Sequence, residues 1–162
     1  MKSLFSLIVL PLFGLCLLGD EPKCDDSQGK AVEQALESFV GTWRIVTAQP
    51  TGVTKDAEKL VFRKDGTYAA LDKKDHELWA GTYDIDPTAK PKIWDHRSID
   101  AQKSGGDVLG IYELDGNNLN VSCVVGTWKE KQWTGKPRPT AFTLPTADAV
   151  LELRRVTTTG KE

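Results

Sequence analysis

The spacing of apolar residues changes near Gly41. Upstream of it, five apolar positions follow the i, i+3, i+4, i+7, i+8 spacing of one helix face: Val32, Ala35, Leu36, Phe39 and Val40. Downstream, short runs of alternating apolar and polar residues are separated by turn residues, which is the pattern of β-strands. Because a lone helix of this length is marginal in water, we expect its apolar face to dock on the sheet.

Two hairpins are predicted in the first half of the strand region. A three-residue loop at 64–66, with a glycine at the left-handed position, pairs the flanking strands so that Phe62 lies beside Tyr68. A four-residue loop at 72–75 then brings Tyr68 beside Trp79 on the same face.

A third hairpin is predicted around a loop at 115–118. It sets Leu114 against Leu119 and Tyr112 against Val121. The three hairpins select mutually consistent apolar faces, which is stronger evidence for a sheet than any single alternating run.

Further strands are predicted at residues 91–95, 140–144 and 149–156, in addition to the one that follows Gly41. The strands lie at hairpin spacing and no helices are interleaved between them. This pattern predicts an all-β fold, an antiparallel meander of about 8 strands with one short N-terminal helix. The sheet is expected to close into a β-barrel, and a sandwich is the alternative.

The first strand opens with Gly41-Thr42-Trp43, directly after the predicted helix. This Gly-x-Trp resembles the opening of lipocalins and fatty-acid-binding proteins, whose barrels also tend to carry an arginine near the end of the last strand. Arg155 in "LELRRV" is the residue that resembles that arginine. The resemblance implies structural roles: Trp43 closes one end of the barrel, Arg155 stacks on its ring, and Gly41 lets the helix end approach.

A broader resemblance covers nearly the whole chain after its N-terminal segment. The series "GTWRIV", "KLVF", "GTYDIDPTAKPKIWD", "GIYELDGNNLNV", "RPTAF" and "VLELRRV" resembles the uncharacterised lipocalin-like domain family expanded in planctomycete bacteria. That family implies a small barrel, usually exported, with no established activity. The connection at residues 49–58 is too short for the two-helix lid of fatty-acid-binding proteins, so their ligand preference is not carried over.

The N-terminus has the pattern of a secretory signal. Lys2 precedes an apolar run over residues 4–18, which contains Pro11 and is shorter than the ~20 residues of a transmembrane helix. The expected organisation is a signal peptide at 1–19, a disordered linker at 20–28 and a lipocalin-like β-barrel domain at 29–158. We expect an exported protein, periplasmic or secreted, without an integral membrane span once the signal is removed; an N-terminal anchor is the alternative.

The formal net charge of −2, from 21 basic and 23 acidic residues, indicates neither a nucleic-acid-binding protein nor a polyanionic tail. Two cysteines follow the predicted signal, Cys24 and Cys123. In an oxidising compartment they could form a disulfide. The simpler interpretation is a thiol in a flexible tail and a small apolar residue in a strand.

Candidate catalytic residues are few. His76 and His96 each follow an aspartate, but their spacing matches no metal-ligand motif, and their turn or strand-end positions predict that both are solvated. The chain shows no nucleophile elbow, phosphate-binding glycine loop or Cys–His signature. We therefore expect no catalytic residue, no metal and no cofactor, and a binding protein rather than an enzyme.

Four aromatic residues fall on the face assigned to the barrel interior: Tyr68, Trp79, Tyr83 and Tyr112. In a small barrel such residues either fill the core or line a cavity. They support the hypothesis that the barrel binds a small, partly apolar molecule, with these four side chains as its contacts.

A second set of aromatic residues lies in the segment 126–139, where Trp128 and Trp133 stand among basic residues and no strand is expected. An exposed tryptophan is costly unless it packs or binds. The alternative hypothesis is therefore an interaction module in which Trp128 and Trp133 contact an envelope protein or a glycan. A loop that folds over the barrel mouth and buries both rings would remove that role.

Overall fold

Burial alternates along the strands, as the sequence pattern predicts. In β4 (Glu77–Asp86), Tyr83 and Ile85 are buried, whereas Thr82 and Asp84 are exposed. Side chains of one parity therefore form the interior of the molecule and those of the other parity face outward.

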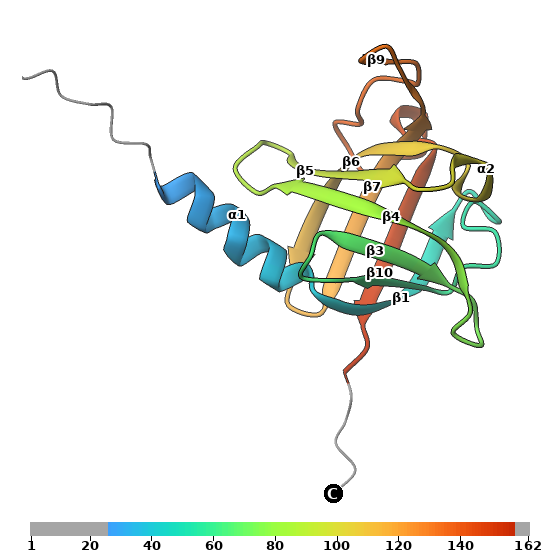
Figure 1. Cartoon of the computed structure of the whole chain (residues 1–162), viewed down its shortest axis with the longest axis horizontal. Helices are drawn as coiled ribbons and strands as arrows, with labels where there is room; N and C mark the ends of the chain where they lie inside the picture. The colour runs from blue at the N-terminus through green and yellow to red at the C-terminus, as the bar shows by residue number, and fades with distance from the viewer. Residues whose placement is uncertain (1–25, 158–162) are drawn as a thin grey trace, which may run out of the picture.

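The computed structural model describes residues 26–157 and closes eight of its strands into an antiparallel barrel (Figure 1). The order around the barrel is β1-β10-β7-β6-β5-β4-β3-β2, so that neighbours in sequence pair and β10 returns to β1. The strands are β1 (Gly41–Gln49), β2 (Lys59–Phe62), β3 (Thr67–Leu71), β4 (Glu77–Asp86), β5 (Lys92–Ser98), β6 (Asp107–Asp115), β7 (Asn118–Gly126) and β10 (Ala149–Arg155). The predicted all-β barrel is confirmed, and the sandwich alternative is wrong.

Five shorter or peripheral elements complete the fold: α1 (Asp26–Phe39), α2 (Ala101–Ser104), β8 (Trp128–Lys129), β9 (Gln132–Trp133) and the 3-10 helix η1 (Leu144–Thr146). The helix α1 begins at Asp26, inside the segment 20–28 that was expected to be a linker. The predicted signal peptide and Cys24 lie outside the described residues.

The apolar face of α1 docks on the barrel only at its C-terminal end. Phe39 is fully buried, and Ala35 and Leu36 pack against the same core. The N-terminal part of the helix extends away from the barrel (Figure 1). Docking at this end closes one mouth of the barrel, because the chain enters β1 directly after Phe39.

Two of the three predicted hairpin registers are confirmed. Phe62 lies opposite Tyr68, and Leu114 lies opposite Leu119. The register predicted for the second hairpin is wrong because the pairing shifts between Ala70 and Leu71.

The partner of Tyr68 moves by two residues, one because Leu71 pairs with Glu77 rather than His76 and one because of this shift. Ala70 pairs with Trp79 and Leu71 with Glu77, so Leu78 is an extra residue in β4. Tyr68 instead lies opposite Gly81, where an added Cβ would come within 2.8 Å of the tyrosine ring. The bulge thus places the tyrosine over the one position in β4 that has room for its ring.

The strand predicted at 140–144 is absent, and this prediction is wrong. The segment runs as bends into η1 along the outer side of the sheet, where the Ser122 hydroxyl donates to the Ala141 carbonyl at 3.0 Å. Arg138 fixes the same segment by donating to both carboxylate oxygens of Asp95 and, at 2.7 Å, to the Gly110 carbonyl. Side-chain hydrogen bonds therefore take the place of a strand ladder here.

Candidate functional site

The α1 end of the barrel is closed by Trp43 and Arg155. Trp43 is fully buried, and its Nε1 donates to the Phe39 carbonyl at 2.8 Å. The Arg155 guanidinium carbon lies 4.1 Å from the centre of the tryptophan ring, the contact that the lipocalin resemblance implies. Arg155 also donates to the Val40 carbonyl at 2.6 Å and to the Ser38 carbonyl, so it satisfies the end of α1.

Gly41 makes room for this arginine. An added Cβ would lie 2.9 Å from Arg155 Nη1, and the backbone φ of +134° is one that L side chains rarely adopt. The glycine of the Gly-x-Trp therefore leaves space both for the Arg155 side chain and for the end of the helix.

Tyr83 and Tyr112 belong to the packed core at this end. The Phe39 ring lies 4.8 Å from the ring of Tyr112 and 6.2 Å from that of Tyr83, and Phe62 lies 4.9 Å from Tyr83. The Tyr83 hydroxyl donates to the Arg63 carbonyl at 3.1 Å. Neither tyrosine lines the cavity at the other end of the barrel.

A cavity of about 90 Å³ lies beside α2 and the β1–β2 connection, at the end of the barrel opposite α1 (Figure 1). Its aromatic wall consists of Tyr68, Trp79, Trp94 and His96. The rest of the lining is mainly aliphatic, including Leu60, Val108, Ala149 and Leu151. We refer to this space, with these residues, as the α2-end cavity. Two of the four interior aromatics that the sequence singled out, Tyr68 and Trp79, lie on its wall.

His96 is buried in that wall, so the prediction of a solvated side chain is wrong. It is 4% exposed, and its ring stacks on Tyr68 with 3.9 Å between ring centres. The error arose because β5 continues to Ser98 rather than ending at Asp95, which gives His96 the same inward parity as Trp94. His76 is exposed at a turn, as predicted, and its Nδ1 lies 3.0 Å from Asp72.

Two ring nitrogens in the cavity wall are buried without a hydrogen-bond partner within the described part of the chain: Trp94 Nε1 and His96 Nε2. The two rings lie 3.9 Å apart between centres. Leaving a buried polar group unpaired costs about 1–3 kcal/mol, so such groups are rare in stable cores. Burial also lowers the pKa of His96 to about 3, and its imidazole is therefore neutral at physiological pH.

A two-part cover lies over this end of the barrel. One part is the connection between β1 and β2, which contributes Val53, Thr54 and Ala57 to the lining. The other part is α2, whose first residues are capped by the Asp100 side chain. Lys55 joins the two, because its Nζ donates to the Lys103 carbonyl and lies 5.9 Å from the Trp79 ring centre.

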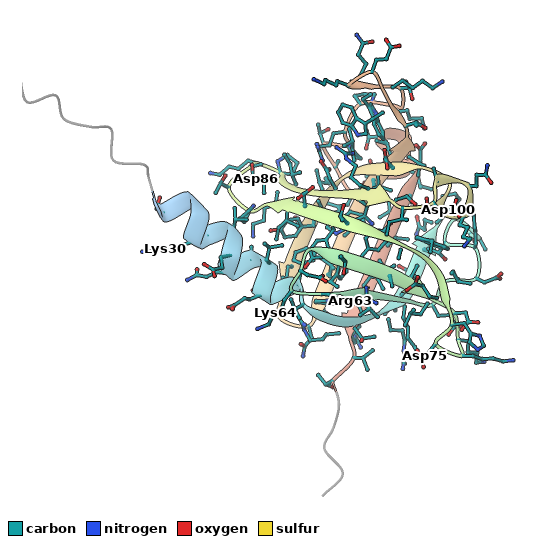
Figure 2. The ribbon with its side chains drawn as sticks, viewed as in Figure 1. Lys30, Arg63, Lys64, Asp75, Asp86 and Asp100 are labelled. Atoms are coloured by element: carbon teal, nitrogen blue, oxygen red, sulfur yellow. The ribbon has the colours of Figure 1, made fainter. Side chains whose placement is uncertain are left out.

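Charged side chains surround the barrel rather than enter it. Arg63, Lys64, Asp75, Asp86 and Asp100 lie on turns and strand ends around its outside (Figure 2). The cavity wall does contain the Cys123 thiol, and burial raises its pKa to about 12. Within residues 26–157, no group of three or more His, Cys, Asp or Glu side chains could hold a metal ion.

Trp128 and Trp133 lie outside the barrel on a short hairpin formed by β8 and β9, where no strand was expected. The two residues pair across the hairpin with their ring centres 5.6 Å apart. Trp133 packs against Gly126 and donates from Nε1 to the Lys136 carbonyl at 2.6 Å. Trp128 stays 37% exposed, with the Arg97 guanidinium carbon 4.7 Å from its ring centre. Neither ring lines the α2-end cavity.

A larger groove of about 860 Å³ lies between the β4–β5 turn and the neighbouring ends of β6, β7 and β10. Its charged residues are balanced, three basic and three acidic: Lys90, Lys92, Arg154, Glu113, Asp115 and Glu152. It is open to solvent and favours no class of ligand. The smaller cavity is the better candidate because its lining is mostly apolar and includes Trp94 and His96, each of which has a buried ring nitrogen without a partner in the described residues.

No family model matches this chain, and neither a curated protein nor a solved structure shows a significant match to it. In the part of the chain that the structure describes, no helix is both long enough and apolar enough to cross a membrane.

Proposed function

We propose that this barrel binds a small, partly apolar molecule in the α2-end cavity, with Trp94 and His96 as its polar contacts. The observation that carries the proposal is the pair of buried ring nitrogens without partners on two residues that line one cavity. A ligand that pairs with them would recover the free energy that their burial costs.

The two nitrogens define the polar part of the ligand. Trp94 Nε1 carries a hydrogen and can only donate, whereas a neutral imidazole protonated at Nδ1 accepts at Nε2. A hydroxyl group can accept from Trp94 and donate to His96 at the same time. The aliphatic remainder of the wall suits an uncharged body, because an ion would lose its hydration without gaining a counter-charge.

The cavity also limits the size of the ligand. A protein cavity of roughly 150 Å³ accommodates benzene. The volume of about 90 Å³ therefore corresponds to a compact molecule of about four non-hydrogen atoms. A longer ligand would have to displace the cover formed by α2 and the β1–β2 connection.

Binding is favoured over catalysis by the state of the two reactive groups in the wall. Burial keeps His96 neutral and lowers its basicity, and it keeps Cys123 as a thiol rather than a thiolate. A catalytic pair would require the opposite: pKa values shifted towards neutral pH, so that a group can gain or lose its proton there.

The proposal is tested with 2-propanol and xenon as probes at neutral pH. Trp79 and Trp94 line the cavity, so intrinsic fluorescence and NMR shifts of wall residues report binding directly. A ligand of four non-hydrogen atoms can gain at most about 6 kcal/mol, so the titration covers micromolar to millimolar concentrations. We expect saturable shifts with both probes.

Two variants locate the site, and one serves as control. Ala149→Leu fills the cavity and should abolish both responses, whereas His96→Phe should weaken 2-propanol binding and retain xenon binding. Trp128→Phe, on the outer hairpin, should change neither. Failure of both probes to perturb any wall residue of the wild-type protein would contradict the proposal.

A second candidate function is favoured by the exposure of Trp128 beside Arg97. A stacked aromatic and guanidinium pair on the surface suits the apolar face of a sugar ring, so we propose a glycan as the occupant of the hairpin. Deleting the whole segment 126–139 would also remove Arg138, so Trp128→Ala is the sharper test. It should abolish fluorescence quenching by an N-acetylglucosamine oligomer; unchanged quenching would exclude this surface.

We further propose that the chain is a member of the lipocalin-like family and is exported. The closed eight-stranded barrel and the Trp43–Arg155 stack support the first statement. The apolar run at residues 4–18 supports the second. N-terminal sequencing of protein recovered from the expressing cells tests export: a mature N-terminus near residue 20 is expected, and retention of Met1 would contradict it.

A further inference from the structure

Two arginines face each other on the outside of the barrel. Arg44 in β1 lies directly opposite Arg154 in β10, and both side chains are exposed. Directly opposed residues in an antiparallel pair have Cβ atoms about 4.5–5.5 Å apart, and like charges at such positions destabilise the sheet. A negative charge held between the two side chains would relieve this repulsion.

No such charge comes from the protein itself within residues 26–157. Neither arginine side chain forms an ion pair or a hydrogen bond there, although Glu152 lies two residues before Arg154 in the same strand. The other strand neighbour of Arg44 is Lys59, which adds a third cation to the row. Unlike the two arginines, Lys59 forms an ion pair, since its Nζ lies 2.5 Å from a carboxylate oxygen of Asp75.

The two arginines line a surface hollow of about 560 Å³ together with two exposed valines. Val46 is 54% exposed and Val156 is 40% exposed, and both are among the few large apolar residues on the surface. Val46 faces outward by alternation from Trp43 and Ile45, and the β1–β10 register shift places Thr47 on the outside as well. Unpaired cations and exposed apolar side chains thus share one concave patch.

We propose that Arg44 and Arg154 form a binding site for a single phosphate or sulfate group carried by an amphiphile, whose apolar part contacts Val46 and Val156. Two guanidinium groups offer paired donors that match the oxygens of a tetrahedral anion. The anion relieves the repulsion between the arginines, and the valines select an ester over a free inorganic ion. This site is independent of the α2-end cavity.

The test measures thermal stability against rising concentrations of hexyl phosphate and of inorganic phosphate. We expect hexyl phosphate to raise Tm saturably and to bind about tenfold more tightly than inorganic phosphate. Arg44→Gln and Arg154→Gln should each raise Tm in the absence of anion and remove the response to hexyl phosphate. Lys64→Gln, which removes an exposed cation at the β2–β3 turn, is the matched control and should retain the response.

Vesicles identify the source of the anion. Co-sedimentation with phosphatidylcholine vesicles that contain phosphatidic acid, lost in both arginine variants, would support the site and place its ligand in a lipid surface. A response to hexyl phosphate without vesicle binding would support a free amphiphile. The proposal is overturned if wild type responds to neither probe, if Lys64→Gln loses as much as Arg154→Gln, or if inorganic phosphate binds as tightly as hexyl phosphate.

Discussion

The two ends of the barrel are both built from aromatic side chains, yet they treat polar atoms differently. At the α1 end the Trp43 Nε1 and the Arg155 guanidinium donate to carbonyl groups at the end of the helix. At the opposite end Trp94 Nε1 and His96 Nε2 are buried without partners in the described residues. The filled end, with its polar atoms paired, stabilises the fold, whereas the end with a cavity and unpaired atoms is where we propose that a ligand binds.

The contrast shows that aromatic content alone does not locate a binding site. Tyr83 and Tyr112 surround Phe39 in a filled core, while Tyr68 and Trp79 stand beside open space. What distinguishes the two ends is the pairing of their polar atoms and the volume left between their side chains.

The largest expected effect is at the filled end. Trp43→Ala should lower the free energy of unfolding by about 3–5 kcal/mol, because it removes a fully buried ring together with its hydrogen bond to Phe39. Denaturant titration measures the loss. A loss below about 1 kcal/mol would show that this end is not a packed plug.

Arg155→Met should lower the free energy of unfolding by about 2 kcal/mol, because it keeps much of the aliphatic stem but removes the charged donors to Val40 and Ser38. Urea titration of this variant beside Arg154→Met gives a matched comparison, since Arg154 makes no such contacts. Equal effects of the two variants would remove the special role assigned to Arg155.

His96 should make stability depend on pH. Its pKa is about 3 in the folded protein and near 6.5 when unfolded, so between these values the unfolded state binds more protons. Stability should therefore fall as pH decreases through this window, by at most about 1.4 kcal/mol per pH unit from this residue. Tyr68 and Cys123, which share the cavity wall, have pKa values raised to about 12 and do not titrate in this range.

His96→Phe supplies the comparison, because it removes the titrating group and the unpaired nitrogen while keeping an aromatic ring. The stability difference between wild type and variant should change with pH, in favour of the variant below about pH 6.5. Carboxylates contribute equally to both proteins and cancel in this difference. Parallel stability curves would show that His96 is solvated or ionised in the folded state.

The smallest effect on stability is expected for Ala149→Leu. The added methyl groups enter the cavity, so the free energy of unfolding should change by less than about 1 kcal/mol, while binding of 2-propanol is lost. Calorimetric unfolding combined with the fluorescence titration separates the two. A large destabilisation would show that the space is too small to accept a ligand.

Much of the architecture could be predicted from local patterns. Turn chemistry at residues 64–66 and 115–118 defined two hairpin registers, because loop length and side-chain parity act over a few residues. The bulge at Leu78 could not be predicted in this way. It places the Tyr68 ring opposite Gly81, a contact between two strands that is visible only once they pair.

The candidate site was predicted only in part for a similar reason. Tyr68 and Trp79 have a clear inward parity in their hairpins, but the end of β5 was misplaced and His96 was left outside the barrel. The alternation Trp94-Asp95-His96 was the available signal. Residues 140–144 were predicted as a strand, yet they lie outside the barrel because Arg138 and Ser122 bind that segment to the outer side of the sheet.

The most direct test of the central claim is the ¹⁵N NMR spectrum of the histidine side chains during titration with 2-propanol at pH 7. The chain has only two histidines, so exposed His76 is an internal control for buried His96. We predict a neutral His96 ring whose Nε2 resonance shifts saturably while His76 does not move. A His96 resonance that is unchanged, or that moves in parallel with His76, would contradict a ligand site at the α2 end.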